Sequence, residues 1–155
     1  MMKFIVILAI AGGAGYYFYQ NRVPSEPIDP IFAEIRLRHE SGVELVGIAK
    51  MISPEDCEQR SEMFWKNVFK DGAQFDWVSG HCTREISERH LAMFSNNTIH
   101  ATYIAMDKGT PAERDGRFVI YGVPSSDAAS VCPALIKKLH EKYTGKIRCV
   151  QGTVG

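Results

Sequence analysis

The feature that most constrains this chain is an uncharged run of sixteen residues, Phe4 to Tyr19, close to its N-terminus. Met1, Met2 and Gln20 extend the run to roughly the shortest apolar length that crosses a bilayer as a helix. The run ends in four aromatic residues, which suit the interface at the outer end of such a helix. We therefore expect residues 4–20 to form a membrane-spanning anchor.

A cleaved signal peptide is the alternative for the same segment, because its apolar core needs only about 7–15 residues. Gly13 and Gly15 are small residues of the kind that precede a cleavage point. Either way, Lys3 lies on the short N-terminal side, which favours that side remaining in the cytoplasm. The expectation is a single-pass protein of the bacterial inner membrane, with its C-terminal domain in the periplasm.

Three segments follow from this division of the chain. Residues 1–20 are the anchor or signal segment, and residues 21–30 are a linker with three prolines in seven residues, which makes it extended and semi-rigid. Residues 31–155 have the size of one ordinary globular domain. The linker should hold this domain at a short distance from the membrane.

Charge and composition exclude two classes of protein. Hydrophobic residues make up 45% of the chain, which excludes disorder of the whole. Lys plus Arg and Asp plus Glu both number 18, and this balance argues against a nucleic-acid partner, because phosphate binding requires a basic surplus. We expect instead contact with the membrane through residues 4–20 and with an envelope protein partner.

The pattern after the linker predicts an α+β domain. Residues 31–39 fit a short helix or a strand equally well, because their apolar residues alternate with charged ones. A helix should begin at Ser53-Pro54, where serine can act as N-cap and proline as the first residue. A second helix is expected to start near Ser130, since Pro133 is tolerated only in a first turn. The expected strands are residues 44–51, 75–82, 98–106, 117–123 and 146–151, with a short helix within 83–94.

The order strand, helix with an early cysteine, and cysteine-bearing strand occurs twice, over residues 44–82 and 117–149. Two such βαβ units predict a two-layer sandwich of the split-βαβ, ferredoxin-like kind, with an insertion between the units. The sheet should have four or five strands, and both helices should pack on one face of it. The residues expected to be buried together are Phe64, Trp65, Val68, Leu135 and Leu139.

The four cysteines allow three pairings. In a right-handed βαβ unit, the start of the helix lies near the end of the strand that follows it. This relation favours disulfides Cys57–Cys82 and Cys132–Cys149. A low-pKa thiol at either helix start is the alternative, but the chain has no Cys-x-x-Cys motif and thiols outside the cytoplasm are usually paired.

One polar cluster is a candidate site. His81, Glu85 and His90 lie within ten residues, but their spacing matches no tight metal-ligand pattern, and arginines flank them. A solvated helix surface explains the cluster better. His100 is expected in a strand, whereas His39 and His140 are expected on exposed helix surfaces.

No catalytic, nucleotide-binding or metalloprotease motif occurs, so we predict no cofactor and no metal, and we lean towards a non-enzymatic role. The leading hypothesis is an anchored domain that acts as a binding or assembly component of an envelope complex. The alternative is a small-ligand-binding protein or an enzyme with a site around His81, His90 and His100. A deep pocket with a histidine beside an acid would favour the alternative, and a flat apolar patch would favour the first hypothesis.

Overall fold

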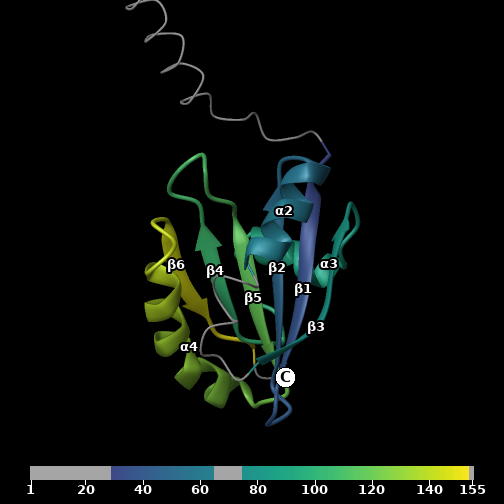
Figure 1. Ribbon diagram of the computed structural model, residues 1–155. Coiled ribbons are helices and arrows are strands. Elements are labelled where there is room, and N and C mark those ends of the chain that lie inside the picture. The colour runs from purple at the N-terminus through teal and green to yellow at the C-terminus, as the bar shows by residue number, and fades with distance from the viewer. Residues whose placement is uncertain (1–28, 65–74, 154–155) are drawn as a thin grey trace, which may run out of the picture.

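A computed structural model describes residues 29–64 and 75–153 (Figure 1). The predicted anchor, most of the linker, Trp65 and Val68 lie outside the described residues, as does the side chain of Phe64. Within the described ranges, no helix is long and apolar enough to cross a membrane. The described residues form an α+β domain with one open sheet.

Six antiparallel strands make the sheet, one or two more than expected. They are β1 (Ile31–His39), β2 (Glu44–Met51), β3 (Phe75–Thr83), β4 (Tyr103–Asp107), β5 (Gly116–Tyr121) and β6 (Lys146–Val150), in the spatial order β3-β1-β2-β5-β4-β6. The segment that fitted helix or strand is therefore a strand. β1 pairs with β2 on one side and with β3 on the other, and this pairing decides between two periodicities that the sequence left equal.

The two halves of the chain have the same connectivity. β2 and β3 both run antiparallel to β1, which lies between them, so they are parallel to each other and are joined by helix α2 (Pro54–Phe64). In the second half β5 and β6 flank β4 in the same way, joined by α4 (Ser125–His140). The halves meet where β2 pairs with β5.

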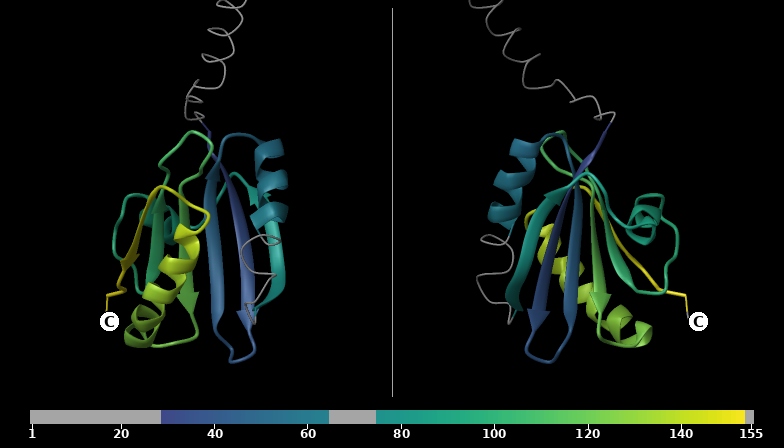
Figure 2. Two further views of the ribbon diagram at one scale, coloured as in Figure 1. Left: turned by 60° about the vertical axis from the view of Figure 1, so that its left-hand side comes forward. Right: turned by 90° about the vertical axis from the view of Figure 1, so that its right-hand side faces the viewer.

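Helices α2 and α4 pack on the same face of the sheet, as predicted (Figure 2). Leu139 of α4 is buried in the core on that face, and Leu135 is partly buried against it. A third helix, α3 (Glu88–Phe94), covers the opposite face, where Met93 is buried against strand residues. The domain therefore has one layer more than the expected two-layer sandwich, because α3 covers the second face of the sheet.

Helix α2 begins where its sequence predicts. Pro54 is its first residue, and the hydroxyl of Ser53 accepts a hydrogen bond of 3.1 Å from the Asp56 amide. Helix α4 corrects the expectation for Pro133, since it starts at Ser125 and contains that proline in its interior. Pro133 is exposed, whereas Cys132 and Leu139 are buried on either side of it, so the packing of the inner face outweighs one missing hydrogen bond on the solvent side.

Candidate functional site

Each half contains one disulfide that ties its helix to its edge strand. Cys57 of α2 is bonded to Cys82 of β3, and Cys132 of α4 to Cys149 of β6, with Cα separations of 6.1 and 5.9 Å. The predicted pairing is confirmed. No cysteine is free, so neither Cys57 nor Cys132 offers a thiolate for nucleophilic chemistry.

The predicted cluster of His81, Glu85 and His90 does not converge on one point. His81 lies on β3, directly opposite Glu34 in the strand pairing, and is exposed. Glu85 is exposed in the turn before α3. His90 belongs to α3, and its side chain is buried between this helix and the sheet. The expectation of a solvated surface is therefore wrong for this residue. Among the residues that the structure describes, no three His, Cys, Asp or Glu side chains are placed to hold a metal ion.

His90 instead joins α3 to the sheet. Its Nε2 lies 3.2 Å from the Tyr121 hydroxyl, and its Nδ1 lies 3.8 Å from the Glu34 carboxylate. Glu34 also accepts two hydrogen bonds from the Arg36 guanidinium. Burial lowers the pKa of His90, although the nearby Glu34 carboxylate acts in the opposite direction. This environment favours the neutral imidazole, which suits a packing role between two layers.

The remaining histidines also differ from expectation in part. His100 lies in the loop before β4 and is exposed, so the predicted strand position is wrong. His39 ends strand β1 rather than a helix, and its ring lies 5.2 Å from that of Phe75. His140 is exposed at the end of α4, as expected.

A groove between α2 and α4 is a feature that the sequence analysis did not predict. Its volume is about 630 Å³, and its described lining residues include no histidine. Its floor is a row of small residues on adjacent strands, because Ala33 pairs with Ala49 and Ala49 pairs with Gly116. Directly paired residues point to the same face of a sheet. Three neighbouring strands therefore present almost no side chain at this level, which leaves the space open.

Larger apolar residues bound this row along the strands. On one side lies Met51, and on the other lie Ile35 and Phe118, with the Phe118 ring placed over Gly47. Met63 of α2 and Leu139 of α4 contribute to the side walls. The hollow is thus one residue row wide, in a floor that is otherwise filled by large side chains.

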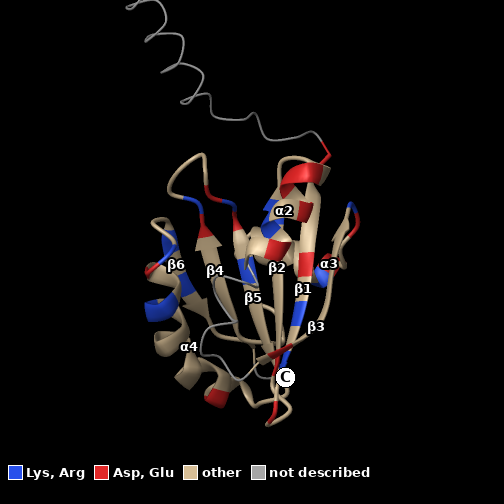
Figure 3. Ribbon diagram, viewed as in Figure 1, with Lys and Arg blue, Asp and Glu red and all other residues tan. Residues whose placement is uncertain are grey.

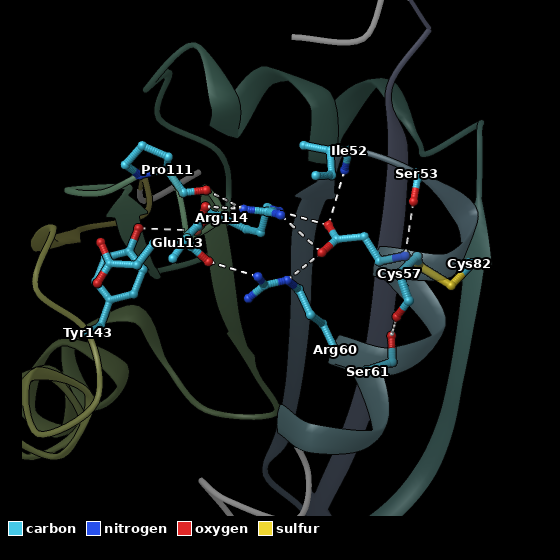
Figure 4. Close-up of polar contacts among 12 residues, drawn as sticks. Ile52, Ser53, Cys57, Arg60, Ser61, Cys82, Pro111, Glu113, Arg114 and Tyr143 are labelled. Carbon is cyan, nitrogen blue, oxygen red and sulfur yellow. Dashed lines mark hydrogen bonds and ion pairs between the residues drawn. A yellow bond between two sulfur atoms is a disulfide. The ribbon is translucent and has the colours of Figure 1, made fainter. Parts of the chain in front are cut away.

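A polar network forms the rim where α2 approaches the β4–β5 loop (Figure 4). Asp56 accepts hydrogen bonds from Arg60 Nε at 2.6 Å and from Arg114 Nε at 2.7 Å, and Arg60 Nη2 donates to the Ala112 carbonyl. Burial alone would raise the pKa of Asp56, but hydrogen bonds from Arg114, Arg60 and the Ile52 amide together lower it. The network keeps a charged carboxylate between two guanidinium groups at the edge of an apolar space.

The same rim continues to the end of α4. The Glu113 carboxylate accepts four hydrogen bonds, from the Gly109 and Thr110 amides and from the amide and hydroxyl of Thr144. Tyr143 donates its hydroxyl to the Arg114 carbonyl, and burial raises the pKa of this tyrosine. These contacts fix the loop and the end of α4 against each other, which gives the groove a firm polar boundary.

Basic residues lie along helix α4, which forms one side of the groove (Figure 3). Lys137 and Lys138 lie in the last turn of α4. Lys146 and Arg148 of β6 lie on the opposite face of the sheet, because they pair with Asp107 and Ala105. Lys142 lines the groove itself and is exposed. Lys142 is therefore the lysine of this region that borders the groove.

A scan against protein-family models found no match, and searches of curated proteins and of solved structures likewise found none. The geometry of the chain itself is therefore the basis for assigning a role.

Proposed function

We propose that this chain is a non-enzymatic binding domain, tethered to the outer side of the bacterial inner membrane, which serves as a binding component of the envelope. Residues 4–20 would be the anchor and residues 21–30 the spacer. The groove between α2 and α4 would be its binding site. We further interpret each half as a split βαβ unit, in which the strand between the two parallel strands, β1 or β4, comes from the same half.

The main support for this proposal is the groove. Binding sites for small organic molecules are typically concave, mostly apolar and about 300–1,000 Å³ in volume, with a few polar groups at defined positions. A groove of about 630 Å³ with apolar strands as its floor and an Asp56–Arg60–Arg114 rim fits this description. The two disulfides support an address outside the cytoplasm, because disulfides persist in oxidising compartments.

The alternative site around His81, His90 and His100 has less support. His81 and His100 are exposed, and the buried ring of His90 in α3 is hydrogen-bonded to the Tyr121 hydroxyl. None of the three lines the groove, which lies on the opposite face of the sheet. His90, which lies beside Glu34, therefore has a packing explanation.

Site-specific photocrosslinking in the full-length, membrane-bound chain tests the proposed site. Met63 lines the groove and is 49% exposed, whereas Leu91 on α3 is 51% exposed and lies on the opposite face. A photoreactive amino acid at position 63 should form an adduct that is absent at position 91. The variant Ala49→Phe, which fills the floor, should abolish the adduct. Equal products at both positions, or an adduct that survives floor filling, would contradict a binding role for the groove.

Intact-mass measurement of the mature protein tests the proposed address. An uncleaved anchor predicts the mass of the whole chain. A mass that lacks the first 15 to 25 residues would show that the segment is a signal peptide and that the domain is released from the membrane.

A further inference from the structure

We propose that the ligand of the groove is a single-chain anionic amphiphile, such as a fatty acid, whose hydrocarbon chain lies over the small-residue floor and whose acidic head lies beside Arg60 and Lys142. This inference rests on the proposed binding function and specifies its ligand. Three independent features of the groove support it: its width, its lining and its charge.

The width of the hollow fits one hydrocarbon chain. The open row of Ala33, Ala49 and Gly116 runs across three strands. Met51 bounds it on one side, and Ile35 and the Phe118 ring over Gly47 bound it on the other. The bounding residues on the two sides are four positions apart along a strand, about 13 Å between Cα atoms. Their side chains occupy part of that distance and leave less than the diameter of an α-helix with its side chains, about 10–12 Å. A slot one residue row wide accommodates an extended chain and is too narrow for a docked helix.

The lining suits flexible hydrocarbon. Met51, Met63 and Met106 come from three different elements and all border the groove. Methionine is unbranched and polarizable, so it adapts to ligands of varying shape. An apolar chain placed here would gain burial against these side chains and against Phe118, which stabilises binding roughly in proportion to the apolar area covered.

The charge at the rim favours an acidic head group. Arg60, Arg114 and Lys142 are the cations of the described lining, and Glu113 is its carboxylate. Glu113 is already saturated by its four hydrogen bonds. Every guanidinium nitrogen of Arg114 is also engaged, with Asp56 or with the Pro111 and Glu113 carbonyls.

Two donors at the rim remain available. Arg60 uses Nε and Nη2 for Asp56 and Ala112, and its Nη1 has no hydrogen-bond partner within the described ranges. The Lys142 ammonium likewise has no ion-pair partner there. A carboxylate or phosphate beside these two groups would be attracted to both, whereas a neutral head group would gain no such attraction.

Strand addition by a protein partner has less support. Such a partner pairs with an exposed sheet edge, and the groove floor consists of inner strands. The β3 edge is also interrupted, because Arg36 pairs with Ser79 and Leu37 with Trp77, which leaves Val78 as a bulge. A bulge of this kind is one of the devices that keep an edge from pairing with another chain.

The test uses the full-length chain in membranes and a photoreactive palmitate that carries an alkyne tag. After irradiation, peptide mapping should place adducts on peptides that line the groove, including the one that contains Met63, and not on the α3 peptide that contains Leu91. Unlabelled palmitate should compete for this labelling, and hexadecanol, its neutral counterpart, should compete less well.

Three variants sharpen the comparison. Lys142→Met should lower the apparent affinity for the acid about fivefold, which is the effect of one charge at about 4 Å in water. Lys137→Met makes the same change at an exposed lysine of α4 that does not line the groove, and it should leave the affinity unchanged. Ala49→Phe should reduce labelling by palmitate, with its thermal melt as the check that it is folded.

The outcomes separate the two proposals. Equal labelling of the α2 and α3 peptides, or equal competition by the acid and the alcohol, would overturn the anionic amphiphile. If palmitate fails to label the groove while the photoreactive residue at position 63 forms an adduct that Ala49→Phe abolishes, the binding function would stand and its ligand class would be wrong. Failure of both crosslinking experiments would overturn both proposals.

Discussion

Gly47 and Phe118 face each other across strands β2 and β5, and the Phe118 ring occupies the space that a side chain at position 47 would need. A Cβ atom added to Gly47 would lie 2.8 Å from Cε1 of that ring, closer than such atoms approach in proteins. The next paired position differs, because a Cβ on Gly116 would have only ordinary contacts at 3.8 Å or more. Two glycines in adjacent strands therefore have different roles.

This difference predicts opposite effects of the same substitution. Gly47→Ala should lower the free energy of unfolding by about 1–3 kcal/mol, because the Phe118 ring must move within a packed core. Gly116→Ala should be neutral or stabilising by up to about 1 kcal/mol, since it restricts the unfolded chain without a clash. Urea denaturation of both variants provides the measurement. Equal destabilisation by the two changes would show that the ring is not held over Gly47.

The disulfides were predictable because one local relation determined both. Cys57 lies early in α2, and Cys82 and Cys149 lie in the strands that follow the two helices, positions that a parallel βαβ unit brings together. Cys132 lies midway along α4, because that helix begins five residues before the predicted start, yet the same pairing forms. Ser53 and Pro54 similarly marked the start of α2 by their own chemistry. Such features depend on residues close in sequence or on a rule that holds for any right-handed crossover.

The groove was not predictable for the opposite reason. Ala33, Ala49 and Gly116 belong to three strands, and each is ordinary in its own segment. They leave a hollow only because the strand pairing places them in one row. Sequence periodicity gives the face of a residue but not its neighbour on the next strand. The burial of His90 escaped detection similarly, because it depends on which face of the sheet α3 covers.

Removal of the disulfides should cost similar stability in the two halves. The bonds join residues separated by 25 and 17 positions, and loop closure of this size contributes about 3 kcal/mol on an entropic account. The double variants Cys57→Ala/Cys82→Ala and Cys132→Ala/Cys149→Ala should each melt at a lower temperature yet keep groove binding in the cold. Peptide mapping of unreduced protein checks the pairing itself, and a bond between Cys57 and Cys132 would contradict the architecture.

Stability should fall at mildly acidic pH because of His90. Its pKa is lowered in the folded state, so the unfolded chain binds the proton more tightly. The loss should begin as the pH falls below the ordinary histidine value of about 6.5 and continue to the folded-state pKa, at no more than about 1.4 kcal/mol per pH unit.

The matched substitutions for this prediction are His90→Gln and His140→Gln. The first removes the buried imidazole and should flatten the dependence of the unfolding free energy on pH between about 7 and 5. The second removes an exposed histidine and should leave that dependence unchanged. If wild type and His90→Gln show the same slope, the buried imidazole is not the group responsible.

Arg117 should be the most sensitive position on the α3 face of the sheet. Its side chain is only 2% exposed, and its guanidinium donates to the Met93 carbonyl of α3, to the Met106 carbonyl and to the Asp107 carboxylate. It also lies 4.9 Å from the centre of the Phe94 ring. One cation thus fastens the end of α3 to two strands.

Replacement of this cation should release α3. Arg117→Met keeps the apolar length of the side chain but leaves buried carbonyl groups without donors, so we expect a loss of about 3–5 kcal/mol. Arg38→Met is the matched control, because the Arg38 and Glu44 side chains are 58% and 28% exposed, and their pair should contribute no more than about 1 kcal/mol. Hydrogen exchange should rise first in residues 88–94 of Arg117→Met, since the lost bond to Met93 is the one that fastens α3 directly. Uniform protection across α3 in that variant would mean that apolar packing by Met93 alone holds the helix in place.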